Sequence, residues 1–176
     1  QLVDGGGTLR AMNGGAVIEV NEFAAISADL IGAGLQSVTK TGTETLLLDG
    51  DNRAFNAQFN VAAGTLRVTT DNALGTGGFN VTPGNTTRTT VANGATVQLA
   101  GSGVDMAEHF QINGSGSGSA GNGAIFVSVG DHRLTERIAV QSDSTINVNG
   151  GHSLTVGGAN GRFFSPADRA ITLTQT

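Results

Sequence analysis

The side chains of this sequence that could carry chemistry are few and widely spaced. Three histidines, His109, His132 and His152, recur at intervals close to one turn of a repeating coil. Three stacked imidazoles could bind Zn²⁺. Polar corner residues between strands are the simpler interpretation, and we favour it. Cysteine is absent, so the chain has no thiolate nucleophile, disulfide or sulfur ligand for a metal.

Carboxylates form two groups that could supply a general acid and a general base, as in polysaccharide lyases and hydrolases. Asp105 lies near Glu108, and Asp131 lies near Arg133 and Glu136. Nothing in the spacing places either group on one face of the fold. We therefore expect solvated corner residues and no catalytic site, and a β-helical carbohydrate-active enzyme is the alternative.

A third acidic segment, Asp49 to Asn52, resembles part of a calcium loop. An EF-hand starting at Asp49 needs a glycine at its sixth position and a glutamate at its twelfth, and the sequence has Ala54 and Asn60 there. We predict an Asx-type corner, in which the side chain bonds to nearby backbone. No metal or cofactor is expected.

Composition excludes several functional classes. Of 176 residues, 28 are glycine, 2 are proline, and only 13% are charged. The apolar share of 38% suffices for a core and argues against a charged disordered tail. With a net charge of −5 and no two lysine or arginine residues adjacent, a nucleic-acid partner is not expected. Apolar runs reach only four residues, so no membrane insertion by this segment is expected.

Short period-2 segments predict strands almost throughout. Near the C-terminal end, apolar triplets recur every eight residues, which fits one strand and one corner; three such steps would close one coil. We predict an all-β fold, a right-handed parallel β-helix of short three-sided coils, with a β-sandwich as the alternative. The expected inward core residues are Leu66, Val68, Val97, Leu99, Ile138, Val140, Ile146, Val148, Leu154 and Val156.

Two segments leave the local structure open. Residues 104–110 form the one plausible helical turn and could equally be a loop. The glycine–serine run 114–121 could be a flexible linker, but strand patterns continue on both sides, so we favour a wide corner of one coil. Residues 1–176 are thus expected to form a single β-helical segment.

Four short motifs occur in the order found in a known family. Residues 38–52 read VTKTGTETLLLDGDN, and they are followed by VAAGTLRV at 61–68, ALGTGG at 73–78 and NGATVQL at 93–99. Together, over residues 38–99, they resemble the passenger-associated transport repeat (autotransporter-associated β-strand repeat) of bacterial autotransporter passenger domains. The pattern departs from the family at Glu44, where a glycine is usual, and after Asn52, where two glycines are missing.

The resemblance implies a non-catalytic stalk or adhesin, extracellular or at the outer-membrane-associated surface of a Gram-negative bacterium. It implies a role in passenger folding and secretion, and a host or matrix surface as a partner. The final residues 173–176 are similar to residues 38–41, which indicates a fragment or repeat unit of a longer passenger. Leu2, Ile171 and Leu173 are expected in uncapped end strands. Those strands would pair with neighbouring coils of the same polypeptide or with another copy in a filament.

Overall fold

Every regular element in the described part of the chain is a β-strand. The computed structural model describes residues 2–3, 8–10, 15–75, 88–118 and 122–176. These residues contain no helix long and apolar enough to cross a membrane. The strands are β1 (Leu2–Val3), β2 (Thr8–Arg10), β3 (Ala16–Glu19), β4 (Ala24–Ile26), β5 (Asp29–Thr41), β6 (Thr45–Leu48), β7 (Phe55–Val61), β8 (Gly64–Val68), β9 (Thr89–Val91), β10 (Ala95–Leu99), β11 (Asp105–Met106), β12 (Phe110–Gly114), β13 (Ile125–Val127), β14 (Asp131–Leu134), β15 (Ile138–Val148), β16 (Ser153–Val156), β17 (Phe163–Phe164) and β18 (Ile171–Gln175).

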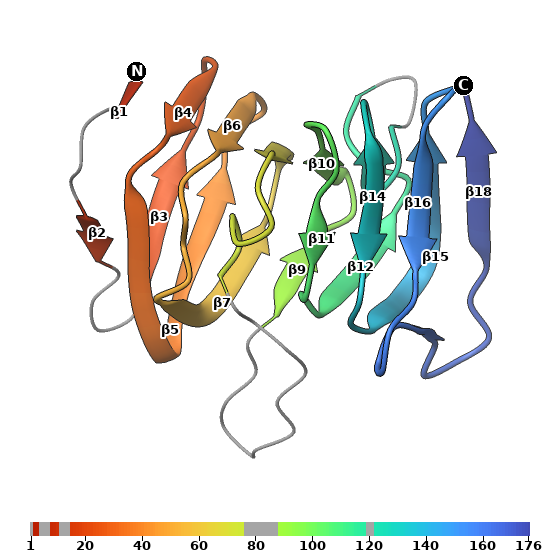
Figure 1. The fold of residues 1–176 in the computed structure, drawn as a ribbon. Coiled ribbons are helices and arrows are strands. Elements are labelled where there is room, and N and C mark those ends of the chain that lie inside the picture. Colours follow the sequence, from red (N-terminus) through yellow and green to blue (C-terminus); the bar gives the residue numbers. More distant parts are fainter. Residues whose placement is uncertain (1, 4–7, 11–14, 76–87, 119–121) are drawn as a thin grey trace.

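Strands stack in parallel, each pairing with strands one coil away rather than with its neighbour in sequence. All pairings between the named strands are parallel, and the colours in Figure 1 run in order from one end of the stack to the other. We call the run β1–β4–β6–β8–β10–β13–β15–β18 the first face. The second face is β11–β14–β16, and the third face is β3–β5–β7–β9–β12–β15–β17. Strand β15 bends and serves both the first and the third face.

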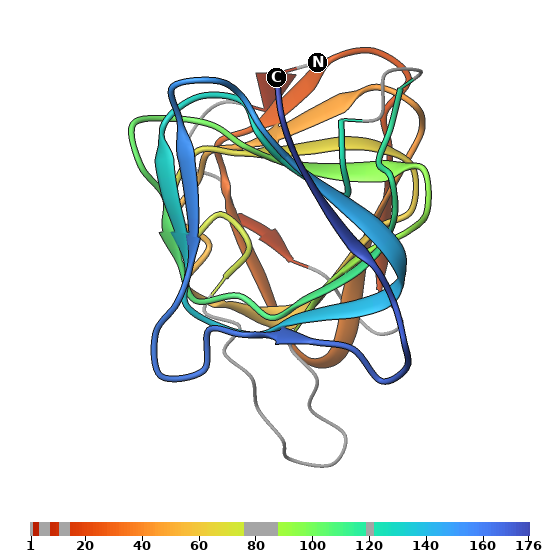
Figure 2. The same cartoon turned by 90° about the vertical axis from the view of Figure 1, so that its right-hand side faces the viewer.

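Viewed along the stack, successive coils superpose around an interior that the inward side chains fill (Figure 2). The prediction of an all-β, repetitive fold with parallel strands is therefore confirmed, and the arrangement is solenoid-like. The coils are less uniform in length than the repeat pattern predicted. Leu46 pairs with Leu66 and Leu66 pairs with Val97, and the second of these steps along the sequence is the longer. The number of residues between paired strands thus varies along the chain, and the register itself shifts within the β5–β7 and β12–β15 pairs.

The core consists of aliphatic and aromatic columns that run through the coils. On the first face, Leu66, Val97 and Ile146 lie in one such column, and all are essentially inaccessible to solvent. Of the residues predicted inward, the fully buried ones are Leu66, Val68, Val97, Leu99, Ile138, Val140 and Ile146. Val148, Leu154 and Val156 pack against the core but are half-buried, because they belong to the last coils and have fewer neighbours.

Glycine at the corner before the first face is required by contact between coils. Gly64 has φ of 65°, and a Cβ on it would lie 2.6 Å from the carbonyl oxygen of Gly42 in the preceding coil. Gly42 is itself at φ 75°, with a Cβ position 2.2 Å from the Val20 carbonyl oxygen. Both the backbone conformation and the space therefore exclude larger residues.

Two local expectations need correction or refinement, and one outward residue is buried. Residues 104–110 contain no helix: Asp105 and Met106 form β11, and Phe110 begins β12. Asn147 faces outward from β15, as alternation requires, yet its side chain is only 6% exposed rather than solvated. The described part of the glycine–serine run is a folded corner, since Gly123 N donates to Ser115 O at 2.8 Å and Ser117 N donates to Thr96 Oγ1 at 2.8 Å. Residues 119–121 lie outside the described residues.

Candidate functional site

Lys40, the lysine of the repeat-like motif, is fully buried near the end of β5. Its Nζ donates to three carbonyl oxygens, those of Thr41 at 3.3 Å, Gly42 at 3.0 Å and Ala63 at 2.8 Å. Burial lowers the pKa of Lys40, while the negative charge of Glu44 favours the ammonium form and opposes that shift. Lys40 thus connects the turn at Gly42 to the next coil, and its three donors are used within the fold.

Asn52, at the end of the same motif, joins three successive coils. Its side chain is 1% exposed; Oδ1 accepts a bond from Leu30 N at 2.7 Å and Nδ2 donates to Ala73 O at 2.6 Å. The sequence predicted an Asx-type corner over Asp49 to Asn52. The backbone partners of the Asn52 side chain instead lie in the preceding and following coils, not in the local turn.

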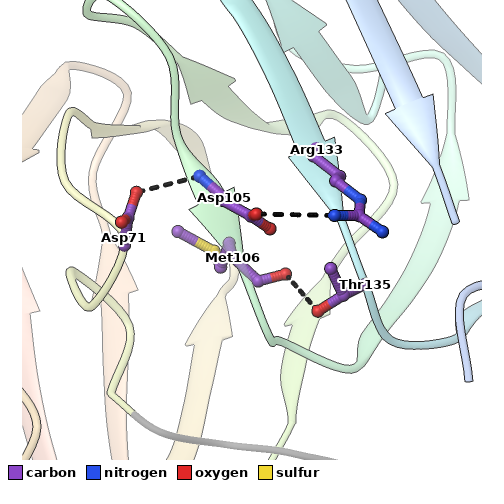
Figure 3. Close-up of polar contacts among 5 residues, drawn as sticks. All are labelled: Asp71, Asp105, Met106, Arg133 and Thr135. Atoms are coloured by element: carbon purple, nitrogen blue, oxygen red, sulfur yellow. Dashed lines mark hydrogen bonds and ion pairs between the residues drawn. The ribbon is translucent and has the colours of Figure 1, made fainter. Parts of the chain in front are cut away.

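The carboxylates of the second face are engaged between coils rather than gathered into an acid–base pair (Figure 3). Arg133 in β14 lies 3.7 Å from the Asp105 carboxylate in β11, and Asp105 N donates to Asp71 Oδ1 at 2.8 Å. Both members of the Arg133–Asp105 pair are about half exposed, so the pair contributes little to stability. Asp131 accepts a bond from Ser153 Oγ at 2.8 Å. The arrangement is a set of coil-to-coil contacts along an exposed face.

The histidines do not converge. His132 Nδ1 accepts a bond from Val104 N at 2.9 Å, and Nε2 lies 2.7 Å from Val129 O, so Nε2 carries the proton. His152 Nδ1 accepts from Gly130 N at 3.2 Å, while His109 lies before β12, at the corner leading to the third face. Across the described residues, no group of three or more histidine or acidic side chains is placed to hold a metal ion.

Glu108 and His109 are buried, although solvated positions were expected for such corner residues. Glu108 Oε1 accepts a bond from Thr89 Oγ1 at 2.9 Å, and burial raises the pKa of Glu108 well above its ordinary value, with the Glu136 charge adding to the shift. Burial lowers the pKa of His109 to about 4, and the charges of Arg137 and Arg88 act in the same direction. Adjacent residues therefore both favour the uncharged form.

These two shifts predict opposite pH dependences of stability. The pKa of His109 in the folded chain lies below the ordinary 6.5, so the unfolded chain takes up a proton first as the pH is lowered. Stability therefore falls as the pH decreases from about 6.5 to about 4. This loss is on the order of 2–3 kcal/mol. Glu108 has a raised folded pKa, so the folded chain binds the proton first and stability rises as the pH falls toward 4.5.

Urea unfolding of His109→Gln and Glu108→Gln at several pH values tests this pair. We expect His109→Gln to lose less stability than the parent between pH 6.5 and 4. We expect Glu108→Gln to gain stability relative to the parent at pH 8, with the gain shrinking toward pH 4.5. Parallel pH profiles for parent and both variants would show that neither group titrates abnormally.

Most candidate residues thus make structural contacts between coils, and Glu108 and His109 form one corner where ionisable side chains are unexpectedly buried. The structure brings Asp105 together with Arg133, and Glu108 near Glu136. It places His132 and His152 on either side of Gly130, but within the described ranges no third ligand joins them.

Sequence reasoning gave Lys40 no role of its own, and it assigned Asn52 only to a corner. The available signal was that Lys40 is the only basic residue of the motif 38–52 and that Asn52 ends it.

Comparison with known proteins adds no relative: no family model matches the chain, and searches of curated proteins and of solved structures found no match.

Proposed function

We propose that this chain is a right-handed parallel β-helix of three-sided coils serving as a non-catalytic, extracellular segment of an autotransporter-like surface protein. Its role is that of a stalk, with the cell surface of a Gram-negative bacterium as its location. The observation that supports this most is the set of core columns running through the coils, from Leu46 and Leu66 on to Val97 and Ile146. Stacked coils of this kind extend along one axis and hold their ends apart.

The repeat-like motif supports the same role. Its two most polar buried residues, Lys40 and Asn52, make their hydrogen bonds to carbonyl and amide groups of adjacent coils. The carboxylates that a polysaccharide-cleaving enzyme would need are engaged between coils, as in the Asp105–Arg133 pair. Incubation with a panel of acidic and neutral polysaccharides, followed by assay of new reducing ends and of unsaturated products, tests the alternative. We expect no turnover, and any cleavage abolished by Asp105→Asn would overturn the non-catalytic role.

The C-terminal end of the stack has features that favour association with a second copy of the chain. A cavity of about 260 Å³ opens there, lined by Thr174 and by apolar residues of the last coils: Ile146, Val148, Leu154, Val156, Phe163 and Leu173. Leu173 is 71% exposed, and Ile171 is half-buried against the core. β1 at the other end pairs with β4 through Leu2 and Ala25, and the Leu2 side chain lies outside what the structure describes. We propose that a second copy covers this end, head to tail, so that copies form filaments.

Charging the terminal strand tests the end-to-end association. We expect the parent chain to show concentration-dependent association by sedimentation velocity, and Ile171→Lys/Leu173→Lys to remain a monomer at the same concentrations. The lysines would bury uncompensated charge against an apolar end. Ala170→Lys/Thr172→Lys adds the same charge at exposed residues that do not line the cavity, and it serves as the control. A parent chain that stays monomeric at high concentration would overturn the filament proposal, and the stalk proposal alone would stand.

A further inference from the structure

Four basic side chains form a line along the stack at the corner before the third face. Strand register pairs Thr89 with Phe110, Phe110 with Ile138 and Ile138 with Phe163. The residues directly before these four are Arg88, His109, Arg137 and Arg162. We call these four residues the arginine row.

Backbone bonds confirm that the row is continuous. Thr89 N donates to His109 O at 2.9 Å, Phe110 N to Arg137 O at 3.0 Å, and Ile138 N to Arg162 O at 2.9 Å. Neighbouring members therefore lie about one strand spacing apart, roughly 4.8 Å at the backbone. Because the inward positions are Thr89, Phe110 and Ile138, the row residues point away from the core. Arg162 is exposed, Arg88 and Arg137 are half-buried, and His109 is buried between them.

The row concentrates positive charge on an acidic chain. The whole sequence has nine lysine and arginine residues and a net charge of −5, yet three arginines fall on this line. Like charges stacked on adjacent strands repel one another. Within the part of the chain that the structure describes, neither Arg88 nor Arg162 pairs with a carboxylate.

The acidic groups near the row do not neutralise it. Glu108 is fully buried, with a hydroxyl bond from Thr89 and a raised pKa that favours its neutral form. Glu136 Oε1 accepts a bond from Asn160 Nδ2 at 3.1 Å and contributes one negative charge. With His109 uncharged near neutral pH, the positive charge of the row comes from its three guanidinium groups.

Aromatic side chains flank one end of the row. The Arg137 guanidinium lies over the Phe164 ring, 4.7 Å from its centroid, which orients that side chain along the surface. Phe163 and Phe164 are 41% and 43% exposed. Half-exposed rings next to a line of cations provide both an apolar surface and charge.

We propose that the arginine row binds a linear anionic polysaccharide, lying along the stack axis with its carboxylates or sulfates on the guanidinium groups and a sugar ring on Phe163 or Phe164. Arginine binds such planar or tetrahedral anions in a bidentate manner. Near neutral pH the charged members of the row are Arg88, Arg137 and Arg162, with the uncharged His109 between Arg88 and Arg137. A polymer with one or more charges per ring can place an anion against each of these three guanidinium groups. Duplex nucleic acid carries a charge about every 1.7 Å, which is closer than guanidinium groups at least one strand spacing apart can match. The proposal goes beyond the stalk role and does not depend on end-to-end association.

Binding of heparin, a sulfated and uronate-bearing polysaccharide, tests the row by titration calorimetry at low salt, with neutral dextran as the blank. We compare Arg88→Gln/Arg162→Gln with Arg53→Gln/Arg133→Gln, which removes the same charge from exposed arginines outside the row. The first variant is expected to bind about tenfold more weakly, with a shallower dependence of affinity on salt. The control is expected to remain within twofold of the parent.

Three outcomes would overturn the proposal: no heparin binding by the parent, equal weakening by both double variants, or tighter binding of a single-stranded oligonucleotide than of heparin. Each variant is checked by thermal unfolding before titration. If the Arg88 change impairs folding, Arg162→Gln alone is compared with Arg53→Gln, since Arg162 is exposed and its change removes no core contact. Phe164→Ala is expected to weaken heparin binding at unchanged salt dependence, because it removes ring contact and no charge.

Discussion

Replacement of Ile146 by aspartate is expected to lower the free energy of unfolding by about 5 kcal/mol or more, a loss that combines the missing aliphatic contacts with an unpaired buried carboxylate. Ile146 is 1% exposed and pairs with Ile125 on one side and Leu173 on the other. Its column is shared by the coils before and after it. Since domains of this size have only about 5–15 kcal/mol of stability in total, we expect loss of the cooperative unfolding transition at 25 °C.

The control for this substitution must carry the same charge on an outward side chain. Asn147 is a poor choice, because its side chain is buried and its Oδ1 has no partner among the described residues. Thr155→Asp places the carboxylate at an exposed outward position of β16, next to Arg133 in register. We expect it to change stability by less than about 0.5 kcal/mol. Urea unfolding followed by circular dichroism measures both, and similar midpoints for the two variants would contradict the inward and outward assignment.

Inward positions could be predicted from the sequence because they depend on one strand at a time. Leu66 and Val68 alternate with Arg67, and Val97 and Leu99 with Gln98, so the period of two alone separates the two sides. The regular steps from Ile138 to Ile146 to Leu154 correspond to successive strands of one coil, β15 in its two halves and β16. Neither inference needs knowledge of what lies in the next coil.

Burial at outward and corner positions could not be predicted in this way, since it depends on neighbouring coils. Glu108 is buried because Thr89, from the preceding coil, lies against it. Asn52 is buried because Leu30 and Ala73 lie on either side of it. The separation of such partners varies with corner length, and the sequence does not give corner length until the strand register is known.

The arginine row could not be predicted from the sequence for the same reason. Arg88, Arg137 and Arg162 are unequally spaced along the sequence, with no common period, and only the register of β9, β12, β15 and β17 aligns them. Isolated arginines in a glycine-rich chain gave no indication of a continuous row. Irregular coil length therefore hides surface features more effectively than it hides the core.

Replacement of Lys40 by methionine is expected to lower the free energy of unfolding by about 3 kcal/mol or more, although methionine has a similar length and is apolar. The Nζ atom donates to three carbonyl oxygens, those of Thr41, Gly42 and Ala63. Methionine fills the space but leaves these acceptors without that donor in a buried turn. Glu44 would also lose the opposite charge that offsets the desolvation of Lys40.

Arg53→Met is the matched control, because it removes a cation of the same motif region whose side chain is 70% exposed and lies 3.2 Å from Asp51 at the surface. We expect a change below about 0.5 kcal/mol there, since exposed ion pairs contribute little. Urea unfolding at pH 7 compares the two variants with the parent. A Lys40→Met variant as stable as Arg53→Met would contradict this expectation. It would show that water or rearranged backbone replaces the three hydrogen bonds of Lys40, and that the lysine is not needed to join the Gly42 turn to the next coil. The expected loss instead places the motif's lysine among the contacts that set the stacking of one coil on another.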